Sequence, residues 1–348
     1  AFSNLVGMGG APLASIFLGE KKREDAEKVF NAGLVLLVLF GVVLTAVVLS
    51  AGDALIRLFG SPDSAFPYAS EYLFVYGTGT IFVMISLGLN PFITAQGFSF
   101  TSMATVAIGA VLNIGLDPLF IFAFGMGVKG AALATVLSQA VSAAWVTLFF
   151  FRRKSQFRFR PAFFRAAPKT VGRILLLGLS PFIMSVTESA IQIVFNVNLR
   201  LWSGGNSDYT AALTIMLSAN QMVCMPLNGL GTGVQPLVSY NYGAGNSARI
   251  RKAIKLVAII ALCGSTSVWL LSILAPQVYG YMFSASDAVM ALVRKYTPFF
   301  MMGTIFFFAQ MTLQNVFVAL NQAKISIFLA CLRKVILLIP LCFLLPYA

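Results

Sequence analysis

An acid and an amide lie close together inside an apolar stretch of this sequence. The stretch VLNIGLDPLFIF covers residues 111–122 and holds Asn113 and Asp117, four positions apart. This spacing places both side chains on one face of a helix. Pro118 has no backbone N–H and frees carbonyl oxygens in the turn before it. Such oxygens suit a cation such as Na⁺, and the carboxylate can instead carry a proton. The alternative is an Asp that only holds helices together through hydrogen bonds.

The second acid inside an apolar stretch is Glu188. Gln192 and Asn196 follow it at every fourth position, and Met184 precedes it in the same register. A polar stripe on an otherwise apolar helix is expected to face a cavity and not lipid. A carboxylate beside an adaptable thioether suits a site for amphipathic organic cations. Hydrogen bonding between helices is the alternative interpretation.

A third stripe contains Phe306, Gln310 and Gln314, again four positions apart and without an acid. We assign these residues to the wall of the same substrate cavity. Their counterparts in the first half of the chain, Ser86 and Asn90, are also polar.

Several kinds of chemistry are excluded by composition. The chain has no histidine, which removes Ser-His and Cys-His hydrolases and HExxH metalloproteases. Its four cysteines lie in apolar runs without a CxxC pair, which favours a packing role. We therefore expect no enzyme, no cofactor and no structural metal.

The elements that carry these residues are membrane spans. The chain has 348 residues, 59% of them hydrophobic and only 10% charged, a composition typical of an all-α polytopic membrane protein. Apolar runs of about 20 residues recur along the whole length and predict about ten spans.

The net charge of +13 reflects membrane topology and does not indicate a nucleic-acid partner. Most of the 24 lysines and arginines lie in alternate loops, which predicts that these loops are cytoplasmic. The largest basic loop, residues 152–173, interleaves basic and aromatic residues. We expect it to lie on anionic lipid headgroups as a cytoplasmic linker.

The sequence repeats itself at a constant offset of 224 residues. Gly7, Pro12 and Ser15 match Gly231, Pro236 and Ser239. The tetrapeptide GTIF occurs at residues 79–82 and again at 303–306. Both copies of the first segment lead into a basic loop, so the two halves share one orientation and each requires an even number of spans. The offset fits six.

Parallel repeats of six spans predict a transporter with its site between two lobes. The repeat offset also predicts that the chain holds spans two to eleven of a twelve-span protein. The predicted boundaries are a first lobe at residues 1–151, the linker at 152–173 and a second lobe at 174–348.

Two motifs resemble those of the multidrug and toxic compound extrusion (MATE) transporters of the bacterial multidrug efflux branch. The run VLNIGLDPLFIFAFGMGVKGAALATVLSQ, residues 111–139, is similar to the fifth and sixth helices of that family. The run GLGTGVQPLVSYNYGAGN, residues 229–246, is similar to its eighth helix. The resemblance covers essentially the whole chain.

The resemblance implies a V-shaped transporter in the bacterial cytoplasmic membrane. Such a protein exports drugs or organic cations in exchange for Na⁺ or H⁺, by alternating access of two six-helix lobes. We expect a monomer whose partners are a small-molecule substrate and membrane lipid. The cation-coupling roles fall on Asn113, Asp117 and Thr135. Some members carry an Asp on the tenth helix, where this chain has Gln310 and Gln314.

Two rival functions remain. A flippase for lipid-linked oligosaccharide or peptidoglycan precursors should line its cavity with basic residues, for which Arg333 and Lys334 are the candidates. An intramembrane enzyme would need clustered acids, cysteines or histidines, which the chain lacks.

Overall fold

The computed structural model describes residues 1–58, 66–163, 167–202, 207–338 and 340–341. For residues 58, 189–190, 192–202, 207 and 333–335 it describes the backbone alone.

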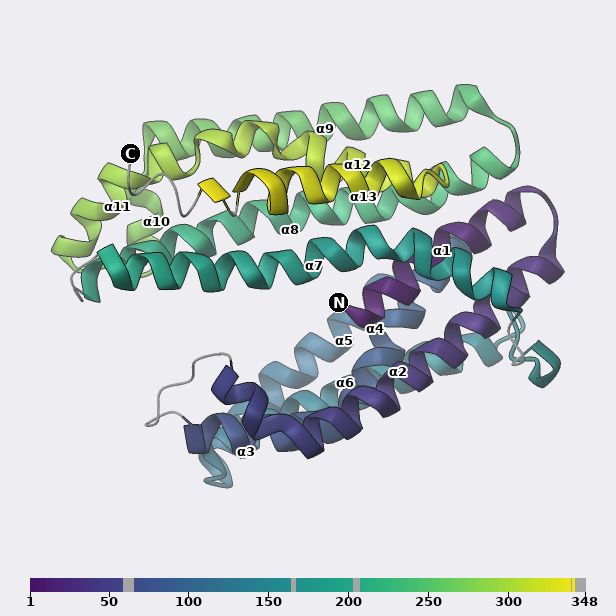
Figure 1. The fold of residues 1–348 in the computed structure, drawn as a ribbon, viewed down its shortest axis with the longest axis horizontal. Helices are drawn as coiled ribbons and strands as arrows, with labels where there is room; N and C mark the ends of the chain where they lie inside the picture. Colours follow the sequence, from purple (N-terminus) through teal and green to yellow (C-terminus); the bar gives the residue numbers. More distant parts are fainter. Residues whose placement is uncertain (59–65, 164–166, 203–206, 339, 342–348) are drawn as a thin grey trace. The chain divides into compact units, whose positions relative to one another are not determined.

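The described residues are mostly helical and contain no strand, which confirms the all-α prediction (Figure 1). Its long helices are α1 (Phe2–Gly19), α2 (Arg23–Leu58), α3 (Phe66–Thr78), α4 (Thr80–Ala95), α5 (Ser99–Pro118), α6 (Gly127–Phe151), α7 (Pro168–Trp202), α8 (Ser207–Gly243), α9 (Ser247–Leu274) and α11 (Asp287–Phe300). The short elements are η1 (Leu119–Ala123), η2 (Pro161–Phe163), α10 (Gln277–Met282), η3 (Met302–Phe306), η4 (Phe308–Leu313), α12 (Gln314–Ala319), α13 (Ala323–Cys331) and η5 (Leu332–Leu338).

Many of these helices are long and apolar enough to cross a membrane. Within the described residues there are eight such helices, or nine when α3 and α4, which meet at a 58° bend, count as one span. The prediction of about ten spans is close to this number. The last apolar segment consists of α13 and η5. It is followed by residue 339 and residues 342–348, which are not among the described residues.

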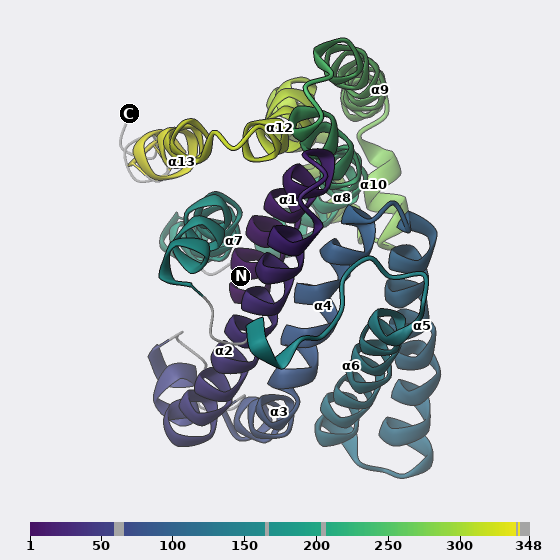
Figure 2. The same ribbon diagram turned by 90° about the vertical axis from the view of Figure 1, so that its right-hand side faces the viewer.

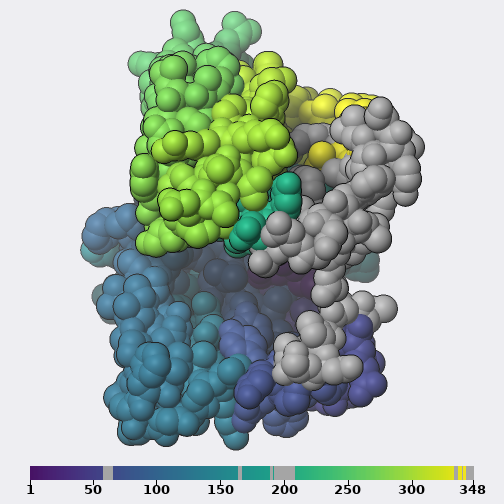
Figure 3. All heavy atoms as spheres, turned by 90° about the vertical axis from the view of Figure 1, so that its left-hand side faces the viewer, coloured from purple at the N-terminus to yellow at the C-terminus, as the bar shows by residue number. Residues whose placement is uncertain are grey.

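The chain separates into two compact units, Ala1–Pro181 and Phe182–Ala348, and the division falls within α7. In the first unit α1 packs against α2 and α4, and α6 packs against α4 and α5. Figure 2 shows α5 and α6 side by side with α4 next to them. In the second unit α8 packs against α9, α11 and α12. Its core contains side chains such as Ala219, Val223 and Val293. Figure 3 shows the end of this unit that carries α10 and α11 as light green spheres.

The sequence repeat has a structural counterpart in the helix boundaries. Helices α1 and α8 end at Gly19 and Gly243, and α2 and α9 begin at Arg23 and Ser247. Likewise α4 and α12 end at Ala95 and Ala319, and α5 and α13 begin at Ser99 and Ala323. Every one of these pairs is separated by the same 224 residues as the sequence matches.

The turns after these helices repeat the same backbone conformation. Lys21 and Gly245 have φ angles of 61° and 71°, and Gly97 and Asn321 have φ angles of 88° and 60°. A left-handed residue just past a helix end lets backbone N–H groups bond back to the last free carbonyls. The two halves therefore share their turn geometry as well as their helices.

An aromatic cluster forms the core at the end of the first unit where the linker begins. Phe30 packs against Phe92, Phe150 and Phe157, with ring centroids 4.5–5.6 Å apart. Phe157 belongs to the linker and is fully buried. The aromatic residues of this loop were expected to contact headgroups, but burying Phe157 among other rings removes far more apolar surface from water.

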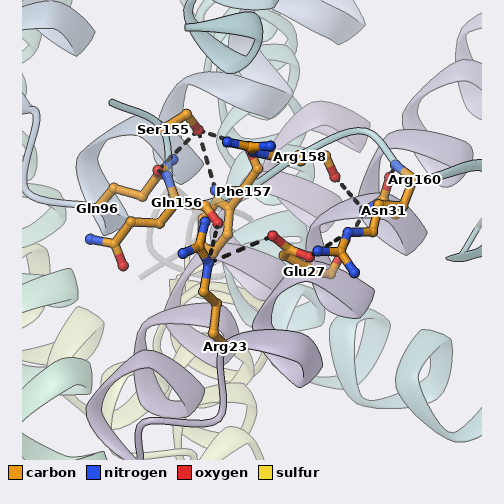
Figure 4. A network of polar contacts seen from close by, with 9 residues as sticks. All are labelled: Arg23, Glu27, Asn31, Gln96, Ser155, Gln156, Phe157, Arg158 and Arg160. Atoms are coloured by element: carbon orange, nitrogen blue, oxygen red, sulfur yellow. Dashed lines mark hydrogen bonds and ion pairs between the residues drawn. The ribbon is translucent and has the colours of Figure 1, made fainter. Parts of the chain in front are cut away.

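Polar contacts fasten the same part of the linker to α2 and to the end of α4 (Figure 4). The Nε atom of Arg160 lies 2.9 Å from a carboxylate oxygen of Glu27, whose side chain is only 2% exposed. Asn31 accepts a hydrogen bond from the Arg160 backbone N–H at 3.0 Å. The Oε1 atom of Gln96 accepts one from the Gln156 backbone N–H at 2.6 Å. The start of the linker is therefore an integral part of the first unit.

Candidate functional site

The first candidate site contains the acid and amide of α5. The Nδ2 atom of Asn113 donates a hydrogen bond to Oδ1 of Asp117 at 3.2 Å, as their helical spacing predicts. It also lies 3.5 Å from Oγ1 of Thr135, which belongs to α6. The structure thus brings together all three residues of the predicted cation-coupling set, from two neighbouring helices.

The helix changes its winding directly after these residues. Pro118 ends α5, and residues Leu119–Ala123 form η1, a single π-helical turn. Pro118 cannot donate to the carbonyl one turn earlier, and a π-turn shifts the next hydrogen bonds by one residue. Backbone oxygens are therefore available close to Asp117. Together with the carboxylate, the amide oxygen and the Thr135 hydroxyl, they form an oxygen-rich environment that suits a small cation.

A polar cavity of about 200 Å³ adjoins this site within the first unit. It lies between α4, α5 and α6, the three helices that Figure 2 shows together. Its lining residues are Ser86, Leu87, Asn90, Thr105, Val106, Gly109, Ala110, Asn113, Thr135, Ser138, Gln139 and Ser142. Sequence reasoning connected only Asn113 and Thr135 among these residues. A signal was present on α6, where Thr135, Ser138, Gln139 and Ser142 follow the i, i+3, i+4, i+7 spacing of one helix face.

The second candidate site surrounds Glu188 in the second unit. A cavity of about 170 Å³ is lined by Met184, Ser185, Glu188, Gln221, Cys224, Met225, Asn228 and Met311. The structure therefore places the predicted acid and thioether on one cavity wall. Two more methionines and two amides complete a surface that combines one negative charge with polarizable apolar groups. Such a surface suits the cationic group of an organic ligand.

The opposite wall of this cavity comes from α8 and was missed by sequence reasoning. Gln221, Met225 and Asn228 are spaced i, i+4 and i+7 and share one face of α8. The stripe is easy to overlook because α8 also carries Pro226 and several glycines.

The remaining predicted cavity residues lie elsewhere or outside the description. Gln310 and Gln314 belong to η4 and α12, and neither lines the cavity beside Glu188. Gln314 is 4% exposed and donates a hydrogen bond to the Ser326 carbonyl at 3.2 Å. Phe306 is 71% exposed. The side chains of Gln192 and Asn196 lie outside the described residues.

The described residues offer little for other chemistry. No group of three or more cysteine, aspartate or glutamate side chains among them could hold a metal ion. Cys224 lies in the Glu188 cavity, with its Sγ atom 3.9 Å from Oδ1 of Asn220, and Cys263 and Cys331 are free thiols.

Comparison with known proteins gives the same family as the motifs. The sequence profile named MatE matches residues 1–119 and 181–344. The Multidrug export protein MepA of Staphylococcus haemolyticus (strain JCSC1435) is 29% identical over 259 residues, which are 74% of this chain and 56% of MepA. The chain therefore spans little more than half the length of that relative.

Solved structures share the fold. The MATE multidrug transporter DinF-BH superposes with a TM-score of 0.91 and 29% identity over 99% of this chain and 77% of its own. A MOP superfamily transporter from Pyrococcus furiosus also superposes with a TM-score of 0.91 over 99% of this chain and 77% of its own, at 22% identity. With a profile match over most of its length, this protein belongs to the MatE family, the multidrug and toxic compound extrusion transporters, and is a multi-pass membrane protein and not an enzyme.

Proposed function

We propose that this protein exports drugs or organic cations across the bacterial cytoplasmic membrane in exchange for Na⁺ or H⁺. The cluster of Asn113, Asp117 and Thr135 carries the proposal, because it combines an intramembrane acid with further oxygen ligands from two helices. The coupling cation would bind there. The names of the relatives, multidrug export protein and multidrug transporter, support drugs as the substrate class.

The mechanism follows from linkage between the two sites. A cation bound at Asp117 favours one arrangement of the lobes, and substrate bound beside Glu188 favours the other. Each ligand shifts the equilibrium only by the difference between its affinities for the two states. In this proposal residues 1–151 and 174–348 are the lobes that move, the linker at 152–173 joins them, and the protein acts as a monomer.

A flippase for lipid-linked precursors is the rival within the same superfamily. It needs basic side chains to hold a pyrophosphate. Among the described side chains, neither cavity is lined by a lysine or an arginine, and the one beside Glu188 carries a carboxylate. This charge favours a cationic substrate. The side chains of Arg333 and Lys334 lie outside the described residues.

The test is drug efflux by the complete natural protein in vesicles under imposed Na⁺ and pH gradients. Asp117→Asn should abolish gradient-driven efflux, because the amide has no negative charge to balance Na⁺ and cannot exchange a proton. Asp53→Asn is the matched control, since Asp53 is an exposed acid that accepts a hydrogen bond from Ser70. Gradient-driven efflux that survives Asp117→Asn would refute the coupling assignment. Transport of a pyrophosphate lipid without drug efflux would support the flippase instead.

A further inference from the structure

Two buried oxygens in the cavity between α4, α5 and α6 lack a hydrogen-bond partner among the described residues. They are Oγ of Ser138 and Oδ1 of Asn90, and both residues line the cavity of about 200 Å³. Ser138 is only 1% exposed. An unsatisfied polar group inside a membrane protein costs free energy, so these oxygens require water or an ion. A polar cavity of this volume has room for several water molecules.

The cavity is elongated along the helices. On α5 its lining extends from Asn113 to Thr105, eight residues or about 12 Å at 1.5 Å per residue. Asn113 lies at the end that contacts Asp117. At the other end, Oγ of Ser142 donates a hydrogen bond to the Thr105 carbonyl at 3.3 Å.

Polar contacts continue from that end toward the linker. Asn90 donates to the Ser102 carbonyl at 3.2 Å, and Oγ1 of Thr94 donates to Oγ of Ser102 at 2.8 Å. Helix α5 begins one turn earlier at Ser99, close to Gln96, which bonds the linker. The basic linker is predicted to be cytoplasmic. Polar groups therefore extend from Asp117 toward the end of the first unit where the linker, predicted to be cytoplasmic, begins.

The second half of the chain provides an internal control for the role of these groups. The bond from Asn90 to Ser102 recurs 224 residues later as the bond from Gln314 to Ser326, also at 3.2 Å. This bond therefore belongs to the shared scaffold.

Three polar positions on α5 and at its end are not repeated in the second half. Thr105, Asn113 and Asp117 correspond to leucines at positions 329, 337 and 341. The shared fold does not need these polar side chains, so they serve something that only the first half does.

We propose that this cavity is a water-filled path through which the coupling cation, Na⁺ or H⁺, moves between Asp117 and the cytoplasm inside the first unit. The path rests on the proposed cation site at Asp117. Gly109 keeps it open, because a Cβ atom at this position would lie 2.5 Å from Oγ of Ser142. In this proposal the substrate and the cation reach the cytoplasmic side by different routes.

The first test measures access from the cytoplasm without measuring transport. In the complete natural protein, every cysteine, including Cys224, Cys263, Cys331 and Cys342, is replaced by alanine, and Thr105→Cys or Ser138→Cys is introduced. Inside-out vesicles are exposed to Ag⁺, a monovalent cation that reacts with thiols in water. After denaturation, the remaining free thiols are counted with a fluorescent maleimide.

Both cysteine variants should lose most of their maleimide labelling after Ag⁺ treatment. Val111→Cys is the control, because Val111 lies on the same helix, is 69% exposed and does not line the cavity, and in an apolar span we expect lipid to shield it from the cation. Protection of Val111→Cys with reaction of the other two supports the path. Full labelling of Thr105→Cys and Ser138→Cys after Ag⁺ treatment would overturn it.

The second test closes the path. Gly109→Leu should fill the cavity and slow gradient-driven efflux at least tenfold while equilibrium binding of the drug is unchanged. Gly115→Leu is the matched control on the same helix, because no atom lies within 4 Å of a Cβ built there. Unchanged efflux in Gly109→Leu would contradict the path, and retained drug binding shows that the variant is folded.

The two proposals fail in different ways. If Ag⁺ does not reach the cysteines but Asp117→Asn still abolishes coupling, the path is wrong and the cation site stands. If Ag⁺ reaches them but Asp117→Asn leaves coupling intact, the cavity is hydrated but has no role in cation exchange, and the path is overturned together with the site.

Discussion

The carboxylate of Glu27 is held 2.9 Å from the guanidinium of Arg160, so a buried acid on α2 fastens the linker to the first unit. The Glu27 side chain is 2% exposed while that of Arg160 is 51% exposed. A second arginine, Arg23, approaches the other carboxylate oxygen at 3.7 Å. Because Glu27 is buried and Arg160 is half exposed, replacing one of them should not change the stability of the protein by the same amount as replacing the other.

We predict that Arg160→Gln destabilises the protein more than Glu27→Gln. The first change leaves a buried charge with only the distant Arg23, whereas the second replaces the charge by a neutral amide. Leaving a buried charged group poorly paired costs about 1–3 kcal/mol or more. The measurement is the apparent midpoint of thermal unfolding in detergent, which should fall by several degrees for Arg160→Gln. Arg153→Gln, in an exposed arginine of the same linker, should leave it unchanged. Equal midpoints for Glu27→Gln and Arg160→Gln would contradict this asymmetry.

We predict that Thr135→Val weakens cation binding while Thr147→Val does not. Both threonines lie on α6 and donate to the carbonyl four residues earlier, at 3.0 and 2.7 Å, but only Thr135 contacts Asn113. Losing one oxygen ligand should raise the dissociation constant about tenfold, equivalent to about 1.4 kcal/mol. If Na⁺ is the coupling cation, the change is measured as a smaller increase in thermal stability on adding Na⁺. If H⁺ is the coupling cation, it is measured as a shift in the pH dependence of efflux. If both valine variants respond to the cation in the same way, Thr135 is not a ligand of the cation.

We predict that Glu188→Gln weakens binding of a fluorescent organic cation by about 10- to 100-fold, the range expected from loss of about 1.5–3 kcal/mol of charge-assisted contact. An uncharged substrate should bind with little change, because the methionines of the cavity remain. Fluorescence polarisation with the purified protein measures both. Glu71→Gln is the control, since Glu71 is an exposed acid outside the cavity. A parallel loss of affinity for charged and uncharged ligands would show that Glu188 acts on structure and not on charge.

We predict that Gly231→Ala destabilises the second unit while Gly233→Ala does not. A Cβ atom at Gly231 would lie 2.5 Å from the Met311 carbonyl oxygen, whereas no atom lies within 4 Å of one at Gly233. Backbone cannot rotate away as a side chain can, so α8 and η4 must separate. The expected cost is about 1–3 kcal/mol. Thermal unfolding of the two variants compares them directly, and equal midpoints would show that the helices can separate without cost.

Much of the fold was predictable because membrane spans and a duplication leave strong signals. The apolar runs predicted the helices, and the 224-residue offset predicted a duplication, which the structure repeats in the helix ends at Gly19 and Gly243. The π-helical segments η1, η4 and η5 were not predicted. A proline or a local mismatch can favour them, but the neighbouring helices decide whether they form.

The candidate sites were predictable only along single helices. The spacing of Asn113 and Asp117 predicts that they meet, and they do. Glu188 shares a cavity with Gln221 and Asn228 because of how α7 and α8 are aligned. Hydrophobic periodicity along one helix does not encode the alignment of two helices. For the same reason the burial of Phe157 was missed, because alternating basic and aromatic residues are typical of a surface loop.

The matching turns at Lys21 and Gly245, and at Gly97 and Asn321, have a consequence for how the molecule can change over evolutionary time. Because the two halves set their helix ends independently and identically, either copy keeps its architecture whatever polar side chains its helix interiors hold. After the duplication, the polar side chains of one copy could therefore change without changing the fold. In the proposed function, the first copy holds the cation site and the second holds the substrate cavity, and both keep the same helix ends.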